Sequence, residues 1–182
     1  MKGFHRDNQL ISLCGLNCGL CPMHLNKYCP GCGGGEGNQS CKIAKCSLEH
    51  NGVEYCFRCS KYPCEKYSHI DDFDSFITHC NRRADMKKAK EIGIEAYNAE
   101  QLEKIKILDI LLSGFNDGRK KTLFCTAVTL LDLQELREVL RQIENRSDLE
   151  TLTLKEKSAF AAKLLKAAAA KNNIELKLRK KK

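Results

Sequence analysis

The sequence predicts a mainly α-helical protein in which a small, loop-rich, cysteine-rich metal-binding module precedes a small all-helical domain. Two observations lead to this expectation. Ten of the twelve cysteines fall between Cys14 and Cys64, in short-spaced sets. After Cys64, apolar residues recur at helical spacing behind residue types that cap helix N-termini. We therefore expect a metal-binding module over residues 1–70, a helical domain over 71–173 and a basic tail over 174–182.

The spacing of the cysteines predicts metal binding. A two-residue gap lets two sulfurs reach one metal ion from a single tight turn. In residues 29–33 (CPGCG), Pro30 fixes φ at the start of such a turn. Gly31 and Gly33 permit backbone conformations that aim N–H groups at thiolates, as in zinc knuckles. The predicted metal ligands are the ten clustered cysteines, Cys14, Cys18, Cys21, Cys29, Cys32, Cys41, Cys46, Cys56, Cys59 and Cys64.

Zinc is the expected metal, as two ions. Two four-thiolate sites use eight of the ten clustered cysteines and leave two over. Three sites would need two further ligands from His24 and His50, and we expect each histidine to be exposed to solvent instead. An iron–sulfur cluster is the alternative. The spacing of residues 14–21 (CGLNCGLC) resembles that by which radical enzymes using S-adenosylmethionine hold a four-iron cluster, but the strand–helix alternation of their barrel is absent.

Disulfide bonds are the competing use of so many cysteines, and they require an oxidising compartment. The N-terminal residues carry no signal-peptide pattern, because the nearest apolar stretch, residues 10–20, is interrupted by polar residues and glycine. No apolar run approaches the ~18 residues of a membrane-spanning helix. We therefore expect a cytoplasmic protein with reduced cysteines and no membrane association.

Several stretches resemble a known family. They are residues 14–22 (CGLNCGLCP), 41–47 (CKIAKCS) and 56–66 (CFRCSKYPCEK), with shorter blocks at 92–95 (IGIE) and 116–121 (NDGRKK). Together they are similar to an uncharacterised, cysteine-rich prokaryotic family, domain-of-unknown-function family 3795. The resemblance extends to about residue 130. It implies zinc binding and names no reaction.

Helical patterning dominates the chain after Cys64. Asp132 with Glu135 and Thr153 with Glu156 have the spacing of capping boxes. The expected helices cover 71–80, then 83–92 with Gly93 as C-cap, and a segment from the capping pair Asn98 and Gln101 to the break at Gly114. They continue with 122–131 as the most buried helix, with 133–143, and with a last helix that follows the Thr153 capping box and ends near Asn172 and Asn173.

The formal net charge of +8 is only weak evidence for nucleic-acid binding. We expect residues 174–182, which end in a run of lysines, to be a solvated tail; an electrostatic contact to RNA, DNA or an acidic partner is the alternative. Basic pairs at 82–83 and 87–88 and three basic residues at 119–121 could extend such a patch. Aromatic residues for base stacking are few, and tryptophan is absent. A protein partner is therefore favoured over nucleic acid.

Catalytic residues are not evident in the sequence. Cys125 lies in an apolar stretch and is expected to be a buried, inert thiol. Cys80 follows His79, but its neighbours give no general-base arrangement. The sequence therefore favours a non-enzymatic interaction or scaffold module. Redox or radical chemistry on an iron–sulfur cluster is the first alternative, and nucleic-acid binding is the second.

Overall fold

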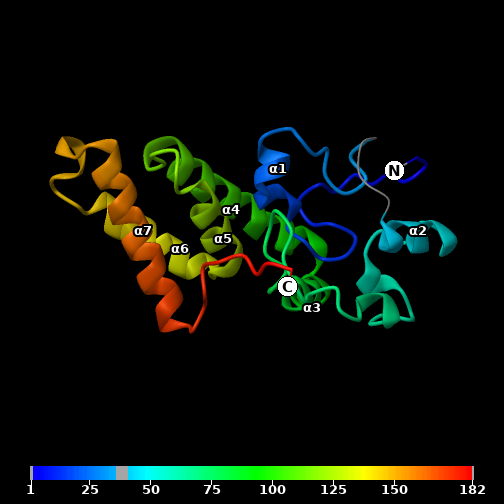
Figure 1. Cartoon of the computed structure of the whole chain (residues 1–182). Helices are drawn as coiled ribbons and strands as arrows, with labels where there is room; N and C mark the ends of the chain where they lie inside the picture. Colours follow the sequence, from blue (N-terminus) through cyan, green and yellow to red (C-terminus); the bar gives the residue numbers. More distant parts are fainter. Residues whose placement is uncertain (1, 36–40, 182) are drawn as a thin grey trace. The chain divides into compact units, whose positions relative to one another are not determined.

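The computed structural model describes residues 2–35 and 41–181. Within these ranges the chain forms seven α-helices and no β-strand, as Figure 1 shows, so the predicted mainly α class is confirmed. Met1, residues 36–40 and Lys182 belong to the predicted module and tail and lie outside the described residues. The helices are α1 (Pro22–Leu25), α2 (Lys42–Glu49), α3 (Arg82–Ile92), α4 (Ile94–Gly114), α5 (Lys121–Leu130), α6 (Leu133–Glu144) and α7 (Leu154–Lys171).

The chain divides into two compact units. The first contains the residues up to Gln101 together with those from Arg179 onward, and the second spans Leu102–Leu178. This division falls later than residue 70, where the sequence analysis placed the end of the metal-binding module. The reason is burial: Tyr97 of α4 is fully buried, and its hydroxyl donates a hydrogen bond to the Asn17 side chain (2.8 Å). The start of α4 thereby belongs to the cysteine-rich unit.

Residues 71–80 do not form the helix that the sequence predicted, and this part of the prediction is wrong. Side chains satisfy backbone groups here that a helix would have used. The Asp74 carboxylate accepts a hydrogen bond from the His79 backbone N–H (2.8 Å), and the His79 ring lies 3.2 Å from the Ile70 carbonyl oxygen. Local hydrogen bonds thus hold this segment as an irregular loop.

Helix α4 begins at Ile94, four residues before the predicted capping pair, so that boundary is also wrong. Gly93 separates the two helices, because its φ of +85° is not helical and ends α3. Asn98 instead accepts a hydrogen bond from the Asn8 side chain (3.1 Å). The C-cap role predicted for Gly93 is confirmed.

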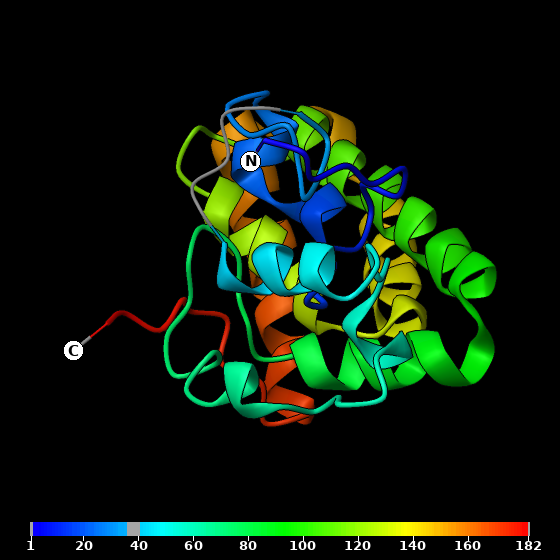
Figure 2. The same cartoon turned by 90° about the vertical axis from the view of Figure 1, so that its right-hand side faces the viewer.

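The second unit is built as the sequence predicted. Helix α5 is the most buried, with every residue from Phe124 to Leu130 inside the core. Capping boxes begin α6 at Asp132 and α7 at Thr153. Helix α7 packs against α5 and α6, which can be followed in Figures 1 and 2. None of the helices in the described part of the chain is long and apolar enough to cross a membrane.

Lys104 closes the end of α5 within the second unit. Its side chain is buried, and its Nζ donates a hydrogen bond to the carbonyl oxygen of Leu131 (2.7 Å), which follows the last turn of the helix. Carbonyl groups at a helix C-terminus lack intrahelical partners, and a lysine both satisfies them and interacts favourably with the helix dipole.

Lys104→Met is therefore expected to lower the free energy of unfolding of the second unit by about 1–3 kcal/mol, the cost of leaving a buried carbonyl without its partner. Lys106→Met, two residues along the same helix at an exposed position, is the matched control and should change stability little. Urea unfolding followed by circular dichroism measures both. Equal stabilities for the two variants would show that Lys104 has no such capping role.

Candidate metal centre

Two cysteines of the candidate site come from one tight turn. Residues Cys56–Arg58 form a 3-10 helix, and the Cys59 N–H donates to the Cys56 carbonyl (3.0 Å). Side chains three residues apart lie on the same side of a 3-10 turn, so both thiols face one direction. The Cys56 N–H donates to the Leu13 carbonyl (3.0 Å), which ties this turn to the N-terminal loop.

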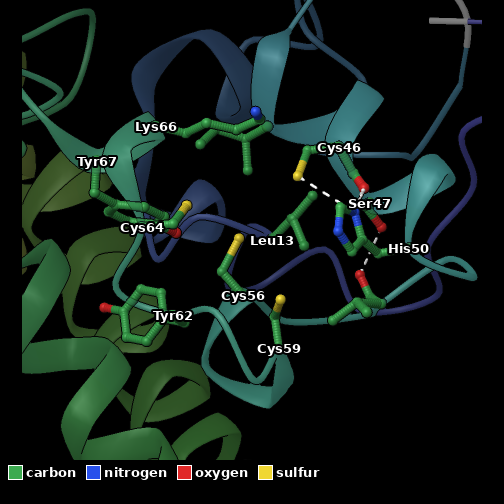
Figure 3. A pocket seen from close by; sticks show the side chains of 12 residues that line it. Leu13, Cys46, Ser47, His50, Cys56, Cys59, Tyr62, Cys64, Lys66 and Tyr67 are labelled. Carbon is green, nitrogen blue, oxygen red and sulfur yellow. Dashed lines mark hydrogen bonds between the residues drawn. The ribbon is translucent and has the colours of Figure 1, made fainter.

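Four thiols line a single cavity. They belong to Cys46 of α2, to Cys56 and Cys59 of the turn, and to Cys64. Figure 3 shows the four sulfur atoms directed toward one common space. The cavity volume is about 30 Å³. A water molecule needs roughly 10–15 Å³ and drug-sized ligands need roughly 300 Å³ or more, so the space fits an ion rather than an organic substrate.

Burial and neighbouring thiols disfavour ionisation of Cys56 at this cavity. Burial raises the pKa of the Cys56 thiol to about 12; the neighbouring Tyr67 hydroxyl lowers it, while Cys14, Cys64 and Cys46 raise it further. A divalent cation reverses this balance, because it stabilises thiolates and deprotonates the thiols that coordinate it. The cavity thiols (Cys46, Cys56, Cys59 and Cys64) therefore have the chemistry of a cation site.

A second group of thiols surrounds the 3-10 turn Cys18–Leu20. The Cys21 N–H donates to the Cys18 carbonyl (3.0 Å), which repeats the geometry of the first turn. Burial raises the pKa of the Cys18 thiol, and the largest further contribution comes from Cys32. The pKa of Cys21 is likewise raised by burial and by Cys29. These loop thiols (Cys18, Cys21, Cys29 and Cys32) thus lie close enough to interact through their charges.

Two glycines determine the backbone conformation around the loop thiols, and a backbone N–H group binds one of these thiols. Gly31 and Gly33 have φ values of +88° and +83°, which L-residues rarely adopt. A Cβ at Gly33 would lie 2.8 Å from the Arg6 backbone nitrogen. The Cys32 N–H donates to the Cys18 thiol and favours its ionised form. Such bonds are what a thiolate site needs from its backbone.

Arg6 is a buried cation between the segments that carry the two thiol groups, and the sequence analysis did not identify it. Its NH1 donates to the carbonyl oxygens of Ile11 (3.1 Å) and Cys32 (3.3 Å), and its Nε donates to the Glu54 carbonyl (3.1 Å). The guanidinium opposes the effect of burial on the Cys32 pKa, because it lowers that pKa by charge and by hydrogen bonding. No pattern in the sequence signals an arginine at this position.

Two predicted ligands fall outside these groups of four. Cys14 is half-buried, and its charge raises the pKa of Cys18, Cys32 and Cys56, so it interacts with thiols of both groups. Cys41 precedes α2, is exposed and does not line the cavity. All twelve cysteines lie within the described ranges, and none of them is in a disulfide bond.

His24 and His50, the two histidines considered as further ligands, are half-buried rather than exposed, so that expectation is wrong. His24 Nδ1 lies 3.0 Å from the Cys29 carbonyl oxygen. His50 Nδ1 lies 2.8 Å from the Cys46 carbonyl oxygen and 3.6 Å from the Cys46 sulfur. Cys46, Glu49 and His50 place three potential ligand atoms within 4.8 Å of one another. A nitrogen donor is thus available at the rim of the cavity.

The remaining predicted features are the two cysteines outside the module, Cys80 and Cys125, and the basic residues of a possible nucleic-acid patch. Cys125 is buried in α5, as expected for an inert thiol, and Cys80 is exposed. Five of the basic residues assigned to a possible nucleic-acid patch are paired with acidic side chains. The ion pairs are Arg82 and Arg83 with Asp71, Lys87 with Glu91, Lys88 with Glu100, and Arg179 with Asp74. Arg179 therefore departs from the expectation of a solvated tail.

The part of the chain that matches a known family is the part that contains the two thiol groups. No curated protein and no solved structure matched the chain. The blocks at 92–95 and 116–121 lie beyond the matched residues, and their resemblance stays a prediction. The resemblance is confirmed for residues 10–69, which match a family described as "Protein of unknown function (DUF3795)".

Proposed function

We propose that this protein is a non-enzymatic metal-binding module in which zinc, bound by the cavity thiols, fixes a loop-rich surface for a protein partner. The supporting observation is that four cysteines line one ion-sized cavity. Four thiolates complete the tetrahedral coordination of zinc and leave no open position for a substrate. A site of this composition is structural, whereas catalytic zinc keeps a position for water.

A second zinc ion is proposed at the loop thiols. Their two Cys-x2-Cys turns supply four sulfurs, and the two sites together use eight of the ten clustered cysteines. The two left over are Cys14, which interacts by charge with thiols of both groups, and Cys41, which is exposed. This assignment agrees with the count of two ions that the sequence favours.

Metal binding would supply folding energy that the first unit otherwise lacks. One of its apolar clusters contains only Phe4, Leu13, Ile43, Ala44 and Tyr67, and four cysteines pack against that cluster. This cluster is small, and structural metal is a common supplement to buried apolar area.

Exposed apolar side chains support a protein partner. In the first unit Tyr28 is 75% exposed and Phe76 is 63% exposed. Aromatic residues are enriched at protein interfaces, where they bury a large area at low entropic cost. Five of the cations that a nucleic-acid patch would use are paired with neighbouring carboxylates.

The proposal is tested by metal analysis and an absorption spectrum after anaerobic purification. We expect a colourless protein with two zinc ions per chain. A brown protein that contains iron and absorbs near ~400 nm would replace the zinc assignment with the iron–sulfur alternative.

Substitution of single cysteines separates the two proposed sites. Cys56→Ser should remove one zinc ion per chain, because a hydroxyl is a much poorer zinc ligand than a thiolate. Cys32→Ser should remove the other. Cys80→Ser, an exposed cysteine outside both groups, is the control and should keep both ions. Full metal content in Cys56→Ser would mean that the cavity thiols do not form the site.

Removal of the metal should affect the two units differently. A strong chelator is expected to abolish protection from proteolysis in the loops before Cys64, because their thiolate–metal bonds are lost. Helices α5–α7 have their own capping boxes and apolar core and should keep their circular dichroism signal. Loss of all helical signal in one transition would show that the two units fold as one cooperative structure.

A further inference from the structure

Asp74 is a carboxylate buried within the first unit whose ion-pair partner comes from residues 174–182, the basic tail. Its side chain is 0% exposed, whereas the Arg179 side chain is 40% exposed. The Arg179 guanidinium donates to both carboxylate oxygens, from NH2 to Oδ1 (2.7 Å) and from Nε to Oδ2 (3.3 Å). A fork of two N–H donors on one carboxylate is the strongest and most selective geometry available to arginine.

The backbone of Arg179 is bound as well as its side chain. Its N–H donates to Asp74 Oδ2 (2.8 Å), and its carbonyl accepts from the Asp74 N–H (2.9 Å). One acidic residue therefore contacts an arginine through the guanidinium and through both backbone groups. An arginine in an extended segment of another peptide offers the same guanidinium, N–H and carbonyl groups, so it could bind Asp74 in the same way.

The loop around Asp74 (residues 70–80, the Asp74 loop) is fixed by its own hydrogen bonds. The His79 N–H holds Asp74 Oδ1 (2.8 Å), and the His79 ring lies between the Ile70 carbonyl and the Ser75 hydroxyl (3.2 and 3.0 Å). The carboxylate is thus positioned by interactions that do not involve the tail. This is the preorganisation that a recognition site requires.

A second cation is recognised two residues further along the tail. The Lys181 ammonium lies 5.6 Å from the centre of the Phe73 ring, within cation–π range. Residues i and i+2 of an extended segment point to the same side, so Arg179 and Lys181 can face the loop together while the side chain between them points away. Phe73 and Asp74 are adjacent in the loop, which matches that spacing.

We propose that the Asp74 loop is a docking site for an extended basic peptide of the pattern Arg-x-Lys, and that residues 179–181 of this chain occupy it in competition with an added peptide of the same pattern. The two recognised groups are a guanidinium, held by Asp74, and an ammonium two residues later, held by Phe73. The site is separate from the proposed metal ligands, and it does not rest on the zinc assignment.

Occupation by the chain's own tail requires only a weak intrinsic affinity. A short flexible connection gives a tethered segment an effective concentration on the order of 1 mM. An intrinsic dissociation constant of about 0.1 mM then leaves the site about nine-tenths occupied by the tail and weakens the binding of an added peptide roughly tenfold. Disengaging the tail should therefore expose a measurable site.

The test uses full-length chains and a fluorescent peptide with the sequence of residues 174–182. We expect the peptide to bind Arg179→Ala about tenfold more tightly than the unaltered chain, because the competing arginine is gone. Adding Asp74→Asn to that variant should abolish binding, and the peptide carrying R179A should bind none of the proteins. Lys180→Ala, at the position between the two recognised residues, is the matched control and should behave like the unaltered chain. Equal binding to all of these chains, or no binding at millimolar peptide, would overturn the proposal.

Limited trypsin digestion keeps the proposal testable if Arg179→Ala disturbs the fold. In the otherwise unaltered chain, Asp74→Asn should raise the initial rate of cleavage after Arg179 at least about fivefold, because a guanidinium held by a carboxylate cannot enter the protease. Cleavage after Lys88 in α3 reports unfolding of the first unit and should not change. An unchanged rate at Arg179, or parallel increases at Arg179 and Lys88, would contradict docking of the tail at Asp74.

Discussion

The main constraint on the first unit is that several cysteine side chains lie close together where burial disfavours the ionised thiolate. At the cavity, Cys46, Cys56, Cys59 and Cys64 converge on a volume of about 30 Å³. Burial and mutual repulsion raise the pKa of Cys56, so an ionised cluster needs a compensating charge. A divalent cation would supply that charge and could bond to the sulfurs, which is why we propose that the function of the unit lies there.

The rest of the unit is arranged around this requirement. The segments that carry the cysteines have little regular structure: two of the Cys-x2-Cys pairs lie on single 3-10 turns, and α2 contributes Cys46. Arg6 connects these segments, because its guanidinium binds carbonyl groups of both the Cys32 and the Glu54 loops. Tyr97 fastens α4 to the same unit through Asn17. Each of these contacts joins residues that are far apart in sequence.

Local chemistry explains which features could be predicted from the sequence. The 3-10 turns, the capping boxes at Asp132 and Thr153, and the C-cap at Gly93 each depend on residues within a few positions of one another. The grouping of cysteines into sets of four depends on how distant loops fold together, and the sequence left it open. The irregular loop at 71–80 was missed for a related reason. Its acidic and apolar residues fit a helix, but Asp74 is bound by His79 and by Arg179, which is 105 residues away.

The central claim is that the thiols provide the whole coordination shell of the bound metal. X-ray absorption at the zinc edge of the purified protein tests this directly, because it reports the number and kind of atoms bound to the metal. The account predicts four sulfur ligands per zinc at about 2.3 Å. A shell dominated by nitrogen or oxygen at about 2.0–2.1 Å would contradict it, and would place the metal outside the two thiol groups.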